Sequence, residues 1–168
     1  MGDETNYADE TGAYRRDTDY IATRITRDGV DGWPVEAGRY RLAAARACPW
    51  ANRALIARRL YGLEDGISLA MAGPVHGEES WTFDLDEDQR DPVLGIHLLR
   101  DAYEARGANV GSGVTVPAMV DVPSGKVATN DFHQMTLDFG QEWRGLHRPG
   151  AHDLFPAEHR DEIMATDK

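Results

Sequence analysis

The chain has 168 residues, of which 41% are hydrophobic, and a formal net charge of −11 at pH 7. This length suits one domain with its own hydrophobic core, and the acidic surface disfavours nucleic acid and anionic membranes as partners. No stretch reaches the ~20 apolar residues of a membrane span, and the acidic N-terminus is unlike a signal peptide, so we expect a cytoplasmic protein.

Composition divides the chain into three segments. Residues 1–33 are polar, lack sustained apolar periodicity and end in a Gly-Trp-Pro run, so we expect an irregular N-terminal arm. Strand-like and helical apolar patterns fill residues 34–143, which we expect to form the folded domain. The remaining residues, 144–168, hold a Pro-Gly loop and then a short helix predicted over 156–165.

The first half of the folded segment predicts a strand, a helix and a strand, over residues 39–46, 49–61 and 67–71. Apolar residues alternate with arginines in the first strand, which is the pattern of a half-buried strand. Pro49 suits the first position of the helix because its missing N–H would be unpaired there anyway, and Gly62 suits the C-cap.

The second half predicts a helix, a strand pair and a last helix, over residues 91–106, 114–120, 127–129 and 132–143. Asp91-Pro92 opens the first of these helices, and either Asn130 or Asp131 can cap the last one. The order of strand, helix, strand, helix, antiparallel strand pair and helix is that of a thioredoxin-like α/β fold, a mixed sheet flanked by helices.

Cys48 is the only cysteine, so it cannot form an internal disulfide. It lies at the start of the predicted helix, where unpaired backbone N–H groups and the helix dipole favour a thiolate, with Arg46 and Arg53 nearby. Ala51 stands where a second cysteine would resolve an oxidised thiol, so any mixed disulfide on Cys48 needs an external thiol. The alternative is an inert, buried cysteine that acts as a small hydrophobic residue.

Three other features are weaker signals. Val116-Pro117 is either the cis-proline that faces the cysteine in thioredoxin-like folds or a trans proline at a strand edge. Trp50 either stacks on an aromatic substrate or packs the first helix. The six histidines lack the spacing of metal ligands, so we expect no metal cofactor.

Six short motifs occur in a fixed order: Arg46-Ala47-Cys48-Pro49-Trp50-Ala51, Gly62-Leu63-Glu64-Asp65, Trp81-Thr82-Phe83, Thr115-Val116-Pro117, Thr129-Asn130-Asp131 and Asp153-Leu154-Phe155-Pro156. In order and spacing they resemble the N-terminal half of the Xi-class glutathione transferases, the glutathionyl-hydroquinone reductases. The resemblance covers about residues 33–163. It implies that 144–168 are a linker and the start of an all-helical C-terminal domain, which in the family supplies the hydroquinone pocket and the dimer contacts. We expect a homodimer only where that domain is present.

The resemblance also implies a role for each candidate site residue. Cys48 would be the catalytic nucleophile, with Pro49 and Trp50 forming the helix N-terminus around it. The small thiol would bind through Trp81, Val116, cis-Pro117, Asn130 and Asp131. The implied reaction is reduction of thiol-substituted hydroquinones, and related aromatic thioethers, through a mixed disulfide on Cys48.

Two departures from the family pattern affect the choice of thiol. Gly113 stands where the family commonly has arginine, and Asp131-Phe132 stands where it commonly has Glu-Ser. Since the missing arginine would pair with a glutathione carboxylate, mycothiol and γ-glutamylcysteine join glutathione as candidate thiols. Two other functions stay open: a glutaredoxin-like deglutathionylase or dehydroascorbate reductase that uses the same cysteine, and a non-catalytic, truncated thioredoxin-like module.

Overall fold

The computed structural model describes residues 20–77, 79–108 and 113–166, so most of the predicted N-terminal arm lies outside the described residues. Its strands and α-helices follow the predicted order closely. They are β1 (Tyr40–Ala44), α1 (Pro49–Tyr61), β2 (Ile67–Met71), α2 (Arg100–Arg106), β3 (Ala118–Asp121), β4 (Lys126–Thr129), α3 (Phe132–Gln141) and α4 (Arg160–Thr166). Short 3-10 turns lie at η1 (Glu87–Gln89), η3 (Arg144–Leu146) and η4 (Ala157–His159).

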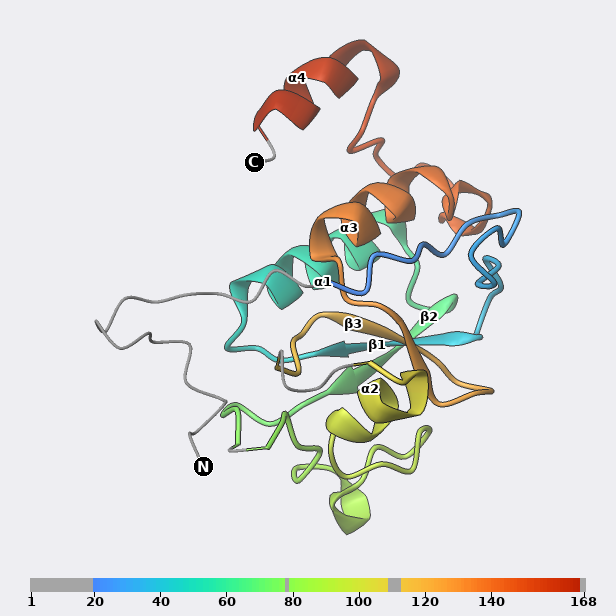
Figure 1. The fold of residues 1–168 in the computed structure, drawn as a ribbon. Helices are drawn as coiled ribbons and strands as arrows, with labels where there is room; N and C mark the ends of the chain where they lie inside the picture. The colour runs from blue at the N-terminus through green and yellow to red at the C-terminus, as the bar shows by residue number, and fades with distance from the viewer. Residues whose placement is uncertain (1–19, 78, 109–112, 167–168) are drawn as a thin grey trace.

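The four strands form one mixed sheet in the order β2-β1-β3-β4. Strand β1 pairs in parallel with β2 and antiparallel with β3, and β4 pairs antiparallel with β3 through a tight hairpin. Helices α1 and α3 pack side by side on one face of this sheet, and α2 covers the other face (Figure 1). This arrangement confirms the predicted thioredoxin-like fold class.

Strand β1 departs from the prediction because all five of its residues are buried. Its alternating pattern indicated one solvated face, but Arg41 is only 8% exposed. The Arg41 guanidinium donates two hydrogen bonds, of 2.8 and 2.6 Å, to one carboxylate oxygen of Asp91, which is itself fully buried. A buried arginine is tolerated only when its charge is paired, and Asp91 provides that partner.

The same aspartate explains why α2 begins at Arg100 rather than at residue 91. Asp91 Oδ1 accepts hydrogen bonds from the backbone N–H groups of Val93 and Leu94, which closes a local turn instead of starting a helix. Gly95 then adopts a left-handed backbone with φ of 69°. Residues 91–99 therefore form an irregular loop pinned to β1, and only its last part leads into a helix.

Two apolar cores hold the elements together, one on each face of the sheet. The core under α1 and α3 includes two residues from the segment before the first strand, Ile25 and Trp33. An ion pair fastens the same segment to α3, because the Arg24 guanidinium binds the Asp138 carboxylate through two hydrogen bonds. Residues 20–33 contain no helix or strand of the sheet, but they pack against the domain.

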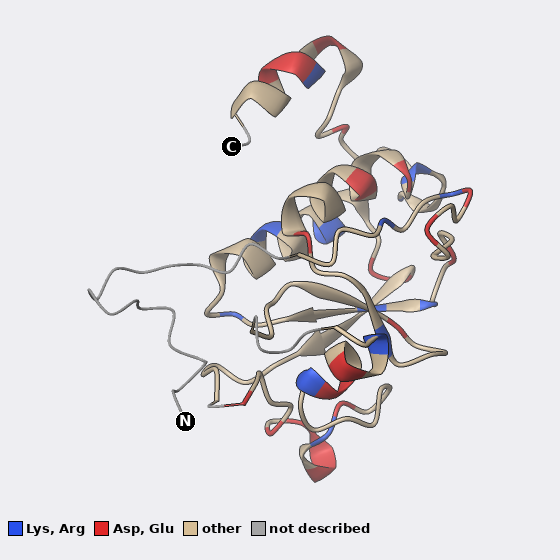
Figure 2. Ribbon diagram, viewed as in Figure 1, with Lys and Arg blue, Asp and Glu red and all other residues tan. Residues whose placement is uncertain are grey.

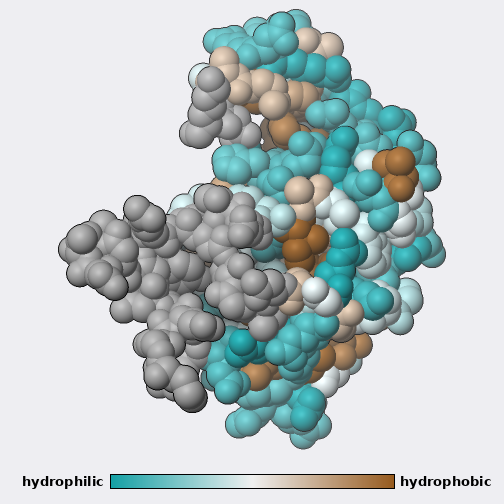
Figure 3. Space-filling model, in the orientation of Figure 1, coloured by the Kyte–Doolittle hydropathy of each residue, from teal (hydrophilic) through white to brown (hydrophobic). Residues whose placement is uncertain are grey.

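Helix α4 is set apart from the sheet, beyond α3 (Figure 1). Between α1, α3 and the residues around α4 lies a groove of about 510 Å³, whose lining includes Ile56, Leu137, Leu154, Phe155 and Ile163. Figure 3 shows the hollow under α4 with apolar residues at its edge. In the described part of the chain, no helix is both long and apolar enough to cross a membrane.

Candidate functional site

Cys48 occupies the N-cap position of α1, with Pro49 in the first turn, as predicted. Its backbone is extended, and its carbonyl accepts the first helical hydrogen bond, from the Asn52 N–H at 3.0 Å. The thiol is half-buried, and Sγ lies 3.3 Å from the Val116 carbonyl oxygen. The proline excludes a backbone donor at its own position but leaves the helix N-terminus facing the thiol.

The peptide bond between Val116 and Pro117 is cis, as the resemblance implied. Residues 114–117 were predicted to belong to a strand, but β3 begins only at Ala118. The preceding segment leaves the sheet, and side chains rather than a neighbouring strand bind its backbone carbonyls. We call residues 114–117 the cis-proline segment.

Three successive carbonyls of the cis-proline segment each accept a hydrogen bond from a different element. The carbonyl of Val114 lies 3.3 Å from His76 Nε2, and that of Thr115 accepts the Tyr103 hydroxyl proton at 2.8 Å. The carbonyl of Val116 faces Cys48 Sγ. By contrast, the Val116 N–H has no hydrogen-bond partner among the described residues. The cis-proline segment is thus held in place through its carbonyl groups, and the Val116 N–H is available as a donor.

The Asn130 side chain binds the cis-proline segment, and its amide group is paired within the protein. The Asn130 side chain is 4% exposed; its Nδ2 donates to Thr115 Oγ1 at 2.9 Å, and its Oδ1 accepts from the Ile21 N–H at 2.7 Å. Both ends of the amide are thus engaged within the protein, and the role of Asn130 in binding the thiol stays a prediction.

Asp131 is the N-cap of α3, where its Oδ1 accepts the Gln134 N–H at 3.1 Å. The other carboxylate oxygen takes part in no hydrogen bond among the described residues. The neighbouring Phe132 ring packs 6.0 Å from Trp50 on α1, so the N-termini of the two helices meet. Trp50 is 37% exposed, and both roles predicted for it, stacking on a substrate and packing the first helix, stay predictions.

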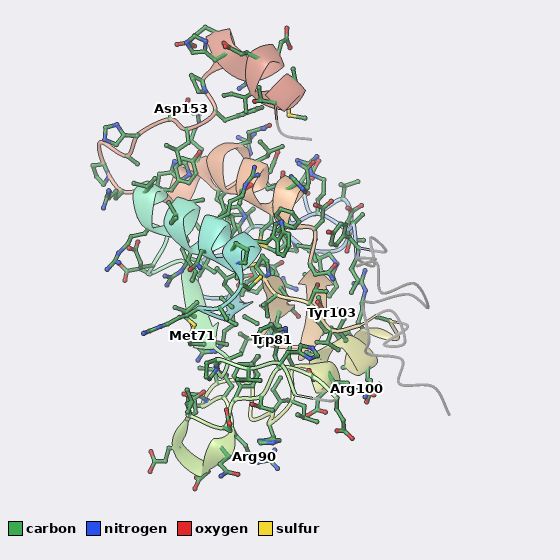
Figure 4. The ribbon with its side chains drawn as sticks, turned by 90° about the vertical axis from the view of Figure 1, so that its left-hand side faces the viewer. Met71, Trp81, Arg90, Arg100, Tyr103 and Asp153 are labelled. Carbon is green, nitrogen blue, oxygen red and sulfur yellow. The ribbon has the colours of Figure 1, made fainter. Side chains whose placement is uncertain are left out.

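Trp81 lies in the loop between β2 and α2, half-buried against the core on the α2 side of the sheet. Its backbone carbonyl accepts the Leu99 N–H at 3.0 Å. His76 meets the Trp81 ring edge-on, with centroids 5.1 Å apart and planes at 85°. Trp81 and Tyr103, both labelled in Figure 4, belong to or pack against the same apolar core on the α2 side of the sheet.

Together these contacts connect every predicted site residue in one chain of neighbours. Cys48 touches Val116; Thr115 binds Asn130, beside Asp131; and Trp50 meets Phe132. Trp81 joins the group through His76, which binds Val114. Sequence reasoning missed the supporting residues His76, Thr115 and Tyr103, since their roles arise from contacts between segments that are distant in sequence.

Helix α1 places no acidic side chain in its first turn, next to Cys48. The first turn of α1 has no acidic residue, whereas acidic residues occur at η1 and in the first turn of α4 (Figure 2). Arg53 directs its Nε to Thr136 Oγ1 on α3 at 3.2 Å. Among the described residues, no three His, Cys, Asp or Glu side chains are grouped as a metal site would require.

Gly113, the position of the missing arginine, has a backbone φ of 91°. This left-handed conformation favours glycine and is strained for residues with a Cβ. The departure from the family pattern is therefore built into the backbone here, and a simple Gly113→Arg change would not restore the family arrangement without a local rearrangement.

Comparisons with known proteins were made on the sequence and on the fold. No protein-family model matches the chain. The curated glutathionyl-hydroquinone reductase PcpF of Sphingobium chlorophenolicum is 36% identical over 140 residues, which are 82% of this chain and 44% of that protein. A solved glutathione transferase from Gordonia bronchialis is 59% identical, with a TM-score of 0.83, over 87% of this chain and 46% of that one. The glutathione-bound structure of Escherichia coli YqjG is 29% identical, with a TM-score of 0.75, over 85% of this chain and 49% of that one.

The chain spans about half the length of these relatives. The solved structures share the thioredoxin-like sheet and helices described above. Over most of its length the chain is therefore similar to about half of each of several glutathionyl-hydroquinone reductases and Xi-class glutathione transferases, which confirms the resemblance that the six motifs indicated.

Proposed function

We propose that this chain carries the thiol-binding and nucleophilic part of a glutathionyl-hydroquinone reductase-type enzyme, with Cys48 as the nucleophile. The observation that carries the proposal is the contact of Cys48 Sγ with the carbonyl of Val116, the residue before the cis-proline. The unpaired N–H of that same residue gives a peptide-like thiol a backbone group to pair with, as an added strand does. A ligand docked there brings its sulfur next to Cys48.

The proposed reaction has two steps that balance. In the first, the Cys48 thiolate attacks the sulfur of a thiol-substituted hydroquinone: the S–S bond forms, the bond from sulfur to the aromatic carbon breaks, and that carbon takes the electron pair and a proton. In the second, an external thiol attacks the mixed disulfide and releases Cys48 as a thiolate. In sum, the external thiol and the sulfur substituent of the thioether leave as one disulfide, and the aromatic carbon gains two electrons and the proton that the external thiol gives up. Such chemistry suits the reducing cytoplasm.

The candidate thiols are glutathione, γ-glutamylcysteine and mycothiol. Glutathione is supported by the YqjG relative, whose structure holds it. The other two are supported by the glycine at position 113, which leaves a carboxylate of the thiol without the family's arginine. Asp131 retains a carboxylate at the N-terminus of α3, where it can accept hydrogen bonds from an amino group of the ligand.

The test is intact-mass analysis after incubation with each of the three thiols as its disulfide, followed by turnover with the matching hydroquinone conjugates. Because Cys48 is the only cysteine, any disulfide adduct reports on it alone. We expect one adduct per chain in the wild type and none in Cys48→Ser, with unchanged unfolding by urea. A wild type that forms no adduct with any of the three, while folded, would exclude the proposal and leave a binding module.

The glutaredoxin-like alternative uses the same cysteine, so the adduct alone does not distinguish it. It is favoured by the groove along α1, which includes Pro49, the residue after Cys48, in its lining and could hold part of a larger thiolated partner. Release of a thiol from a thiolated peptide, without release of hydroquinone from the conjugates, would select this activity.

A further inference from the structure

His76 joins two elements of the candidate thiol site that are otherwise on separate segments of the chain. One is the loop that carries Trp81, and the other is the cis-proline segment, 38 positions along the chain from His76 at its point of contact. The imidazole lies between them: Nε2 reaches the Val114 carbonyl oxygen at 3.3 Å, and the ring meets Trp81 edge-on. Since a carbonyl only accepts, Nε2 carries the proton in this contact.

The local backbone holds His76 and Trp81 close to each other. The Gly77 N–H donates to the Ser80 carbonyl at 3.0 Å, and the Gly73 N–H donates to the Thr82 carbonyl at 2.9 Å, so the loop folds back on itself between the two rings. Ser80 is buried, and its hydroxyl accepts the Arg100 N–H at the start of α2. Ser80, which lies between the two rings in the chain, is therefore anchored to the start of α2.

The contacts of the cis-proline segment alternate between its two sides. Val114 and Val116 contact His76 and Cys48, whereas Thr115 between them contacts Tyr103 and Asn130. The Val116 N–H, which has no partner among the described residues, therefore lies between two contacts. His76 contacts the Val114 carbonyl on one side of it, and Cys48 contacts the Val116 carbonyl on the other.

We propose that His76 is a positioning residue for the thiol ligand, which sets the Trp81 ring against the cis-proline segment at the spacing that a thiol bound to Val116 requires. The inference rests on the proposed function and adds a residue that the resemblance did not include. It does not make His76 part of the bond-making machinery, so the intrinsic reactivity of Cys48 toward a small reagent stays the same without it.

Three substitutions separate the two contacts that His76 makes. His76→Gln keeps a side-chain donor for the Val114 carbonyl but loses the ring, His76→Phe keeps a ring for Trp81 but loses the donor, and His76→Ala loses both. The matched control is His97→Ala, because His97 lies in the same loop and its Nδ1 also contacts a backbone carbonyl, that of Gln89 at 2.6 Å. It contacts neither Trp81 nor the cis-proline segment through its ring.

The measurement is the ratio of two Cys48 modification rates, by the thiol disulfide that labels the wild type and by iodoacetamide, which needs no thiol site. We expect His76→Ala to lower this ratio roughly tenfold, as loss of one hydrogen bond and one ring contact would, with Gln and Phe between Ala and the wild type. His97→Ala should leave the ratio within about twofold.

One result would overturn the inference while leaving the proposed function standing: a ratio in His76→Ala within about twofold of the wild type, including the case in which both rates fall equally. If the wild type is labelled by iodoacetamide but by none of the thiol disulfides, the proposed function fails and the inference fails with it. The iodoacetamide rate thus tells the two failures apart.

Discussion

The N-terminus and the outer face of helix α1 differ in how many contacts the described residues make with them. At its N-terminus, side chains from the loop after β2, from α2 and from α1 hold the carbonyls of the cis-proline segment, and Asn130 holds Thr115. Along its outer face, by contrast, an apolar groove stays open, with Ile56 59% exposed and Leu154 40% exposed. The thiol side is built by polar contacts within this chain, whereas the groove side keeps apolar surface exposed between α1, α3 and the residues around α4.

This contrast says which changes should matter. Buried polar groups that are paired cost free energy when one partner is removed, so the scaffold behind the thiol site should be sensitive to single substitutions. An exposed apolar side chain contributes little to the free energy of folding, because folding does not remove it from water. Substitutions in the groove should therefore change stability little. We expect the effects of substitution on the free energy of unfolding to decrease from the buried polar contacts to the exposed groove.

The largest effect is expected from Asp91→Asn, which removes the buried carboxylate opposite Arg41. The amide can still accept from the Val93 and Leu94 N–H groups, but it faces the guanidinium without a charge. Leaving a buried charge unpaired should lower the free energy of unfolding by about 3–5 kcal/mol. Urea unfolding measures this, with the exposed Asp88→Asn in the same loop as control.

A double variant sharpens that test. Arg41→Met combined with Asp91→Asn removes the orphaned charge, and we expect it to recover a large part of the lost stability. A single Asp91→Asn variant within about 1 kcal/mol of the wild type would mean that the ion pair does not hold the loop to β1.

The next effect concerns the cis-proline segment itself. Tyr103→Phe removes the hydroxyl that binds the Thr115 carbonyl at 2.8 Å, and should lower the free energy of unfolding by about 1–3 kcal/mol, because a carbonyl loses its buried donor. Thr115→Ser keeps both polar groups of that residue and should stay within about 0.5 kcal/mol of the wild type. Equal losses in the two variants would show that packing, not this hydrogen bond, supports the segment.

The features that could be predicted from sequence are those set by a residue and its near neighbours. Pro49 at the first helical position and Gly62 at the C-cap, with φ of 71°, follow from local backbone rules, and the structure confirms them. The same rules left Asn130 and Asp131 as candidate N-caps of α3, and the structure shows that Asp131 is the N-cap. The cysteine at the helix start was predictable for the same reason. Periodicity also placed each strand and helix of the sheet within a few residues, except at two points.

The exceptions depend on contacts between distant segments. The helix predicted over 91–106 was wrong over residues 91–99 because Asp91 binds Arg41 on β1, a partner that no local pattern indicates. The strand over 114–120 was wrong in its first half because His76, Tyr103 and Cys48 bind its carbonyls in place of a neighbouring strand. A lone histidine in an irregular loop carries no sequence signal for such a role.

A pH dependence tests the ion pair that fastens residues 20–33 to α3. Burial raises the pKa of Asp138 above its ordinary value of 3.8, and the hydrogen bonds from Arg24 and Gln134 oppose this only in part. The folded protein therefore holds the Asp138 proton to higher pH than the unfolded chain. The stability that this group contributes is full below 3.8 and is lost as pH rises through its folded pKa.

The measurement is the difference in unfolding free energy between the wild type and Asp138→Asn, from urea titrations across the acid range. We expect the difference to shift against the wild type as pH rises above 3.8, with the exposed Asp161→Asn showing no such trend. A difference that instead favours the wild type with rising pH would mean that Arg24 outweighs burial at this site.

The smallest effect is expected in the groove. Ile56 lies on the outer face of α1 with 59% of its surface exposed, so Ile56→Gln removes little buried apolar area and keeps a residue that suits a helix. We expect the free energy of unfolding to change by less than about 0.5 kcal/mol and the thiol-disulfide labelling of Cys48 to be unaffected. The matched control is Ala57→Gln, one position along, where the side chain is only 6% exposed and a larger residue must displace its neighbours. If Ile56→Gln destabilised the chain as much as Ala57→Gln, the groove would be part of the core of this chain rather than an open face, and the contrast between the two sides of α1 would be lost.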